Sequence, residues 1–395
     1  MSERIKCELC GAMEHSIQKH LKANHPEVTV EQYIQKFPGA PLMSEKAKEL
    51  LAKKRTEKIA AEQGSKVEMA GTGAALASVT TLVPNGSVVK RMLHEVFNLG
   101  SAKAAKSERG EPIPISAIAN PTHPDMVPTI TDNYVYDIDE LKNVILALEL
   151  GIPTYVWGHK GSGKSELFEQ IAARTGRGFM RVQHTVNTEE SHVIGQWTVR
   201  DSQTVFELGP LPLAMINGWM YCADEYDFAL PSVLSVYQAV LEGKALVIKE
   251  ADAGKRIVKP HPNFRFVATG NTNGSGDETG LYQGTNIQNA ANYDRFGMVI
   301  HKQYMKKQAE SLILQNHIGV PEEDANKMVE FASLVREAYD GAKICDVISP
   351  RTLIYATKIG IKRGSYRKGI TLSFTNKLSK VDREVVDGLA QRIFG

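Results

Sequence analysis

Along the second part of the chain, apolar residues follow two patterns, one typical of strands and one typical of helices. From about residue 126, short apolar runs typical of buried strands alternate with stretches whose apolar residues recur at helical spacing. We expect strands at 154–157, 179–183, 219–223 and 264–269, and helices at 139–150, 164–175, 212–217 and 231–241. This alternation predicts an α/β fold with a parallel sheet covered by helices. Strand signals fade after about residue 302, so we expect an α/β core at 125–302 and a helical lid at 303–395.

The first part of the chain lacks these patterns. Residues 41–63 are rich in helix formers and charges, with Glu49 one helical turn before Lys53, which predicts an exposed charged helix. Residues 64–124 are rich in Gly, Ala, Ser, Thr and Pro and predict a flexible linker. A short helix at 87–99 is compatible with that linker, because the apolar residues there would share one helical face.

Composition narrows the class of protein. Of the 395 residues, 42% are hydrophobic and 23% charged, as in globular proteins. No run approaches the roughly 20 apolar residues that span a bilayer, and the polar N-terminus lacks the apolar core of an export signal. We therefore expect a cytoplasmic protein without membrane contact. Cys222 and Cys345 lie among apolar residues and are expected to be buried thiols.

Residues 158–165, GHKGSGKS, match the phosphate-binding pattern GxxxxGK[ST] at every defined position. Glycines let backbone N–H groups surround the phosphates, and the following helix adds its N-terminal dipole. Lys164 would reach the β- and γ-phosphates of ATP, and the Ser165 hydroxyl would bind Mg²⁺. An apolar strand precedes the loop and a helix follows it, as the pattern requires. The expected contacts to the nucleotide come from Gly158, Gly161, Ser162, Gly163, Lys164 and Ser165.

A phosphate-binding loop in an α/β core with a helical lid resembles the AAA+ ATPases, and that resemblance implies an acidic strand end downstream. The apolar run at 219–223 ends in Asp224 and Glu225, at the strand terminus where parallel sheets bind ligands. Asp224 would hold Mg²⁺, and Glu225 would polarise the attacking water as a general base. Alone, such a carboxylate pair also fits a plain helix cap.

Three further polar residues are candidates for the same site. Asn271 follows an apolar strand and could orient the attacking water, although it also fits a turn and Asn273 is a rival. Arg295, in a DRF triplet, could act on the phosphate of a neighbouring subunit, and it equally fits a surface salt bridge. Arg351 begins a lid helix, and a local ion pair explains it as well.

From about residue 124 to 395, roughly two thirds of the chain, the sequence resembles the ATPase subunits of aerobic cobaltochelatases, within the MoxR branch of the AAA+ ATPases. The segments that carry the likeness are GHKGSGKS, CADEYDFALPSVLSVYQAVLEG, KPHPNFRFVATGNTNGSGDETGLYQGT, NYDRF, VISPRT and YVYD. The resemblance assigns Walker A to Lys164 and Ser165, Walker B to Asp224 and Glu225, sensor 1 to Asn271, a trans arginine finger to Arg295 and sensor 2 to Arg351. It also matches 193–208 to an insert in the second helix of the core and 245–259 to a hairpin before sensor 1.

The same resemblance implies a homo-oligomer, a hexameric ring with ATP and Mg²⁺ bound between subunits. Members of the branch typically act on a partner protein that carries a von Willebrand A domain. In cobaltochelatase the ATPase energises the insertion of Co²⁺ into a corrin ring by other subunits. Residues 1–63 depart from the pattern of that family.

The N-terminal residues 1–40 have the features of a small metal-binding module. Two thiolates and two imidazoles are spaced CxxC–x9–H–x4–H, which suits a tetrahedral Zn²⁺ held by Cys7, Cys10, His20 and His25. His15 is a rival ligand. So short a module lacks the core to fold unaided, and the metal would contribute its stability.

This module resembles the short-loop C2H2 zinc fingers of Ros/MucR-type bacterial regulators, which implies DNA contact, with Lys19 and Lys22 meeting phosphates. The first 110 residues carry a net charge of +5 and the remainder −3, which fits an acidic partner or ordinary solvated charge. Recognition of a protein by the finger is equally compatible.

Two functions follow from the sequence. The first is an ATP-hydrolysing AAA+ ring motor that remodels or activates a partner protein, in a metal-chelatase type of complex. The second is a zinc-finger DNA-binding protein whose nucleotide-switched ATPase acts on nucleic acid.

Overall fold

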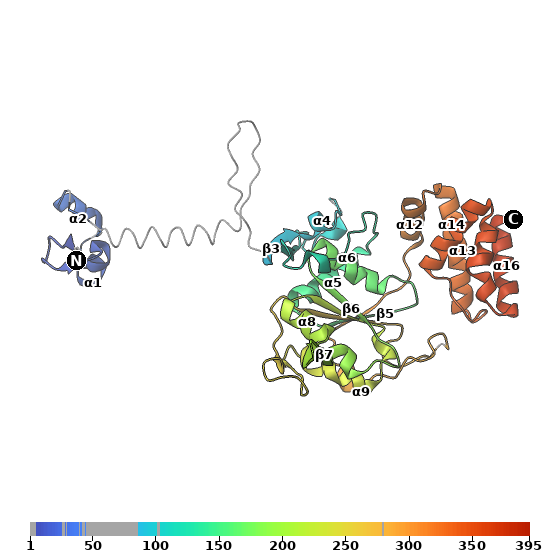
Figure 1. The fold of residues 1–395 in the computed structure, drawn as a ribbon. Helices are drawn as coiled ribbons and strands as arrows, with labels where there is room; N and C mark the ends of the chain where they lie inside the picture. Colours follow the sequence, from blue (N-terminus) through green and yellow to red (C-terminus); the bar gives the residue numbers. More distant parts are fainter. Residues whose placement is uncertain are drawn as a thin grey trace. The chain divides into compact units, whose positions relative to one another are not determined.

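The computed structural model describes residues 5–25, 28, 30–38, 40, 41, 44, 86–100, 103–278 and 280–395. They divide into two compact units, one within residues 1–80 and the other within 81–395 (Figure 1). The charged helix predicted at 41–63 and the first part of the predicted linker, up to residue 85, lie outside the described residues apart from 41 and 44.

The N-terminal unit is a short hairpin followed by two helices. Strand β1 (Ile5–Lys6) pairs antiparallel with β2 (Met13–Glu14), and the helices are α1 (Ile17–Asn24) and α2 (Val30–Lys36). Its buried core consists of four side chains, Cys7, Ile17, Leu21 and Tyr33. A core this small contributes little stability by itself, because few apolar groups leave water on folding.

A five-stranded parallel sheet forms the centre of the larger unit. Its strand order is β13 (Met298–His301), β5 (Thr154–Trp157), β12 (Arg265–Gly270), β9 (Met220–Asp224) and β6 (Phe179–Gln183). Every neighbouring pair is parallel. The predicted α/β fold with a parallel sheet is confirmed, and β13 is a fifth strand that the sequence pattern did not reveal.

Helices cover both faces of this sheet (Figure 1). One face packs against α5 (Ile138–Leu150) and α6 (Lys164–Arg174), and the other against α8 (Pro210–Asn217), α9 (Pro231–Leu234) and α10 (Gln238–Leu241). Side chains of β9 alternate between the two cores, with Cys222 on the α5 and α6 side and Tyr221 on the other. The helix expected at 231–241 is divided into α9 and α10 by a 3-10 turn at Ser235–Tyr237.

The prediction of a linker is wrong for residues 86–100 and 103–124. Strand β3 (Ser87–Met92) pairs antiparallel with β4 (Pro114–Ala119), and α4 (Leu93–Val96) follows β3 directly. Leu93, Phe97 and Ile115 are buried in the same core as α5 and α6. Local composition misses this element because the apolar partners that stabilise it lie later in the chain.

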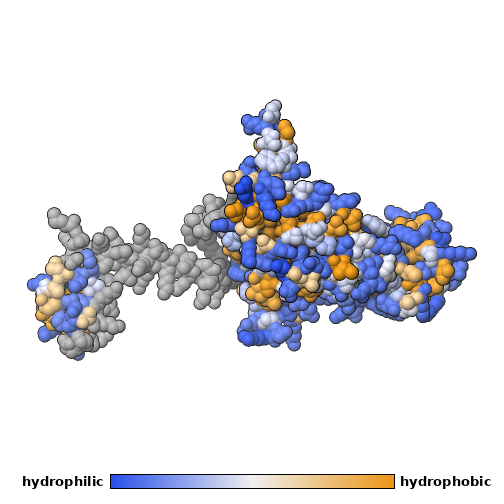
Figure 2. All heavy atoms as spheres, turned by 90° about the horizontal axis from the view of Figure 1, so that it is seen from below, coloured by the Kyte–Doolittle hydropathy of each residue, from blue (hydrophilic) through white to orange (hydrophobic). Residues whose placement is uncertain are grey.

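Two hairpins project from the core at the segments that the resemblance matched. After α7 (Glu190–Ile194), β7 (Gly195–Arg200) pairs with β8 (Gln203–Leu208), and β10 (Leu246–Val247) pairs with β11 (Ile257–Val258). Large apolar side chains are exposed on both hairpins, at Trp197, Val199, Val247 and Ile257. Orange apolar areas lie among polar ones on the face shown in Figure 2.

After β13 the chain is helical. The short α11 (Ala290–Tyr293) precedes that strand, and the helices that follow are α12 (Lys307–Ile318), α13 (Glu322–Asp340), α14 (Pro350–Arg363), α15 (Tyr366–Ser373) and α16 (Lys380–Phe394). They bury an apolar core of their own. Cys345 is exposed, contrary to expectation, because it lies in the loop between α13 and α14, whereas Cys222 is buried as predicted. Among the described helices, none combines the length and the apolar composition needed to cross a membrane.

Candidate functional site

The loop between β5 and α6 has the backbone conformations that only glycine adopts readily. Gly158, Gly161 and Gly163 have φ values of +152°, +71° and +84°. A Cβ on Gly158 would lie 2.1 Å from the carbonyl oxygen of Lys302, and one on Gly161 would lie 2.6 Å from the Cβ of Ser349. The loop therefore requires glycine both for its curvature and for close contact with the segments around it.

Lys164, the first residue of α6, directs its ammonium group back over this loop. Its Nζ donates to the carbonyl oxygens of Gly158 (2.7 Å) and His159 (3.1 Å) and to Oδ1 of Asn271 (3.0 Å). Burial lowers the pKa of Lys164 to about 8. The buried hydroxyl of Ser162 has no hydrogen-bond partner among the described residues. A cation and an unpartnered hydroxyl at the N-terminus of a helix fit an anionic ligand such as a polyphosphate.

The loop opens into a cleft of about 860 Å³, a volume that suits a nucleotide. Five of the six predicted loop contacts line it, namely Gly161, Ser162, Gly163, Lys164 and Ser165. Gly158 does not line the cleft, but its carbonyl oxygen accepts a hydrogen bond from Nζ of Lys164. Apolar and aromatic side chains from the core and the lid also line the cleft, at Tyr134, Val135, Leu281, Met305, Ile313 and Ile354.

Oxygen atoms that suit Mg²⁺ meet at the end of β9. The Ser165 hydroxyl and the Thr269 hydroxyl both donate to Oδ1 of Asp224. Burial raises the pKa of Asp224, but the hydrogen bonds from Ser165, Thr269 and Arg181 outweigh that effect and hold it below its ordinary value. An ionised carboxylate next to a hydroxyl is a donor set that Mg²⁺ prefers, so Ser165 and Asp224 fit the ion.

Glu225 follows Asp224 in a left-handed backbone conformation, with φ of +52°. Its N–H donates to the Thr269 hydroxyl at 3.2 Å, and Oε2 accepts from Nε2 of Gln183 at 2.7 Å. The turn directs Glu225 toward the cleft, where it is one of the lining residues. This placement is the one that a general base for water attack on a bound phosphate requires.

The two asparagines after β12 have different surroundings. Asn271 bonds Lys164 through its side chain, and its N–H donates to Oδ2 of Asp227 at 2.8 Å. Asn273 is exposed, and its Oδ1 accepts from the N–H of Ser275 at 3.1 Å, which is a local turn. The structure therefore brings Asn271, and not its rival Asn273, to the cleft.

The two candidate arginines lie in different places. Arg351, in the first turn of α14, lines the cleft and makes no hydrogen bond or ion pair with any residue that the structure describes. Arg295 lies outside the cleft of its own chain, and its Nε donates to Oε1 of Glu242 at 2.7 Å. The surface salt bridge considered from the sequence is therefore present at Arg295, while no local ion pair forms at Arg351.

Sequence reasoning missed three cleft residues. Arg181 and Gln183, two positions apart on β6, share one side of the strand and bind the Asp224 and Glu225 carboxylates. The hydroxyl of Tyr282 contacts Nδ1 of His159 and accepts from the N–H of Lys160, both at 3.0 Å. Arg181 and Gln183 could have been found from the sequence, because polar residues near the carboxyl end of a parallel strand often line a ligand site.

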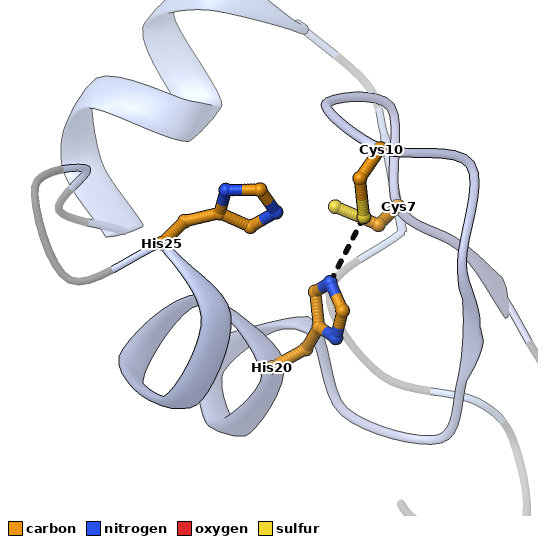
Figure 3. Close-up of side chains that lie close together, drawn as sticks. All are labelled: Cys7, Cys10, His20 and His25. Carbon is orange, nitrogen blue, oxygen red and sulfur yellow. Dashed lines mark hydrogen bonds between the residues drawn. The ribbon is translucent and has the colours of Figure 1, made fainter.

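In the N-terminal unit, the four predicted metal ligands come together (Figure 3). Cys7 and Cys10 lie on the loop after β1, His20 lies on α1 and His25 directly follows that helix. Their ligand atoms all lie within 4.8 Å of one another, and Sγ of Cys10 is 3.1 Å from Nε2 of His20. The rival His15 instead contacts the Ser44 hydroxyl through Nδ1 at 2.9 Å.

Comparison with known proteins places this site in a family. Residues 153–296 match the AAA domain family of the dynein-related subfamily, and residues 310–393 match the CbbQ/NirQ/NorQ C-terminal family. The chain is 32% identical over 280 residues to the aerobic cobaltochelatase subunit CobS of a Sinorhizobium species, covering 68% of this chain and 83% of that protein. It is 26% identical over 219 residues to protein CbbQ of Hydrogenophilus thermoluteolus, covering 55% of this chain and 78% of that one.

Among solved structures, a putative ATPase from Cytophaga hutchinsonii aligns with a TM-score of 0.38 at 16% identity, covering 66% of this chain and 91% of that one. The two family models together span most of the α/β core and most of the helices after it. This protein belongs to the CobS-like ATPases of the MoxR branch of the AAA+ family.

Proposed function

We propose that this protein is the ATP-hydrolysing subunit of a ring motor that remodels or activates a partner protein. The observation that carries the proposal is the convergence of Lys164, Ser165, Asp224, Glu225 and Asn271 on one cleft. ATP supplies the phosphoanhydride bond that is cleaved, and Mg²⁺ would neutralise charge on its phosphates. In this proposal, Lys164 binds the phosphates and Asn271 orients the attacking water.

Replacement of Glu225 by Gln tests this role for the cleft. The amide keeps the size of the side chain but cannot accept a proton, so ATP binding should remain within about threefold of wild type and turnover should fall at least about 100-fold. Binding and steady-state hydrolysis are both measured on the purified chain. Glu108→Gln, at an exposed residue in the loop between β3 and β4, is the matched control. Undiminished hydrolysis by Glu225→Gln contradicts the assignment.

We further propose that the ring is a hexamer in which Arg295 acts on the nucleotide of its neighbour. Arg295 is outside the cleft of its own chain, as a residue that completes the site of another subunit must be. The exposed apolar side chains of the β7–β8 and β10–β11 hairpins support contacts with other chains. The likeness to CobS supports a chelatase-type complex, and a partner with a von Willebrand A domain is the one we propose for the ring.

For the N-terminal unit we propose a structural Zn²⁺ held by Cys7, Cys10, His20 and His25. Ligand atoms around a tetrahedral zinc lie roughly 3.3–3.8 Å apart, so the present spread of up to 4.8 Å requires only small side-chain adjustments. The four-residue core supports this proposal, because so small a module needs further stabilisation.

Metal analysis tests the zinc site directly. The purified chain should contain about one zinc per chain, and Cys10→Ser should lower that content and expose the unit to proteolysis. His15→Ala serves as the matched control, since His15 lies against Ser44 rather than in the cluster. Equal zinc content in Cys10→Ser and wild type overturns this ligand set.

The alternative function, a motor on nucleic acid, has less support. CobS, which is 32% identical to this chain over 280 residues, is a chelatase subunit by name. The side chains of Lys19 and Lys22, expected to meet phosphates, lie outside the described residues.

A further inference from the structure

Arg181 occupies an unusual position beside the metal-binding carboxylate. Its Nε donates to Oδ2 of Asp224 at 2.8 Å, and its terminal nitrogen donates to the same oxygen. The Arg181 side chain is 47% exposed, whereas that of Asp224 is 3% exposed. Because β6 is the edge strand of the sheet, a residue there can reach the buried carboxylate from the solvent side.

Both carboxylate oxygens of Asp224 are thereby engaged. Oδ1 accepts from Ser165 and Thr269, and Oδ2 accepts from Arg181. The neighbouring carboxylate of Glu225 is bound by Gln183, which is neutral. Among the described residues, a cation is hydrogen-bonded to the carboxylate proposed to hold Mg²⁺, whereas none is hydrogen-bonded to the one proposed as the base.

Two cations that share one carboxylate oppose each other, because like charges repel at short range. A guanidinium also binds phosphate oxygens in pairs, and Arg181 lines the same cleft as the phosphate-binding loop. While it is paired with Asp224, this arginine offsets a negative charge that would otherwise repel phosphates in the same cleft.

We propose that Arg181 is a positioning residue that competes with Mg²⁺ for Asp224 and offsets the charge of that carboxylate next to the nucleotide phosphates until the metal takes its place. Without metal it keeps Asp224 fixed at the end of β9. It strengthens the binding of metal-free nucleotide and weakens the binding of the ion. This inference rests on the proposed ATPase function.

A metal titration separates this role from a structural salt bridge. The affinity of the full-length chain for ADP is measured with a fluorescent analogue in EDTA and then at rising Mg²⁺ concentrations. In Arg181→Gln, metal-free ADP should bind about tenfold more weakly, while the half-saturating Mg²⁺ concentration should fall about three- to tenfold. Arg181→Lys keeps the charge and should leave the half-saturating Mg²⁺ concentration close to wild type.

Arg109→Ala, which removes an exposed arginine from the loop between β3 and β4, should change neither quantity. If Arg181→Gln weakens ADP binding equally with and without Mg²⁺, Arg181 is a structural residue and the proposal is wrong. If Arg181→Gln does not fold, the test rests on Arg181→Lys. An unchanged affinity of that variant for metal-free ADP, together with a shifted half-saturating Mg²⁺ concentration, contradicts the proposal. A wild-type chain that binds no nucleotide under either condition refutes the ATPase function itself.

Discussion

At the scale of single residues, a tyrosine hydroxyl holds the phosphate-binding loop in shape. Tyr282 is 7% exposed and comes from a glycine-rich segment far along the chain. Its hydroxyl bonds His159 and the N–H of Lys160 within the loop. Burial raises the pKa of Tyr282 to about 12, so the phenol keeps its proton at neutral pH and can act as donor and acceptor together.

Tyr282→Phe should therefore make the loop less rigid and weaken ATP binding without abolishing it. Loss of hydrogen bonds worth about 1 kcal/mol predicts a three- to tenfold rise in the Kd for ATP. Isothermal titration calorimetry measures the change, with the exposed Tyr355→Phe as control. An unchanged Kd would show that the loop keeps its shape without this hydroxyl.

The residues of the glycine-rich loop were predictable because backbone requirements and the strand before the loop constrain them. Asn271 and Asn273 could not be separated from sequence, since only tertiary contacts show that one bonds Lys164 and the other bonds Ser275. Arg181 was missed for a related reason. An arginine on a strand has many surface roles, and the register of β6 against β9 decides which carboxylate it meets.

At the scale of secondary-structure elements, the half-buried carboxylate of Glu149 is one of the contacts that join the β3–β4 hairpin to the core. The N–H and hydroxyl of Ser116 donate to Glu149 at 2.6 and 2.8 Å, and Nζ of Lys90 donates at 2.5 Å. Burial raises the pKa of Glu149, but these hydrogen bonds outweigh it and lower the pKa below the ordinary value. The linker prediction failed here because a contact between residues 116 and 149 leaves no local pattern.

Glu149→Gln should destabilise the larger unit by about 1–2 kcal/mol at pH 7, since a charged acceptor is replaced by a neutral one. The folded-state pKa is depressed, so this stabilisation is present above the unfolded pKa near 4.5 and is lost as pH falls through the folded value. In urea unfolding at several pH values, the free energies of unfolding of wild type and variant should converge at acidic pH. The exposed Glu108→Gln should track wild type throughout, and a pH-independent difference would contradict the role of the charge.

Elements of the ATPase core were largely predictable where helices are long and strands apolar, as at α6 and β9. The fifth strand β13 was not, because its four residues alternate between half-buried and exposed and give a weak signal. The 3-10 turn that divides the helix expected at 231–241 contains Tyr237, whose hydroxyl contacts Nε2 of His184 at 2.8 Å inside the core. Such tertiary contacts override the local helical preference.

At the scale of the whole molecule, the account requires that one active site be shared by two subunits. Lys164 and Glu225 lie in one cleft of the chain, whereas Arg295 lies outside it. In the proposed ring, each chain would supply parts of two active sites, and repeated identical contacts would bring those parts together.

The most direct measurement is ATP hydrolysis by mixed rings of two inactive variants. Lys164→Ala should lose ATP binding, and Arg295→Ala should bind ATP but hydrolyse it at least about tenfold more slowly. Random assembly of equal amounts pairs an intact phosphate loop with an intact Arg295 at about a quarter of the interfaces, so the mixture should regain about that share of wild-type activity. A mixture no more active than the average of its parts, or an Arg295→Ala protein as active as wild type, would contradict the shared site.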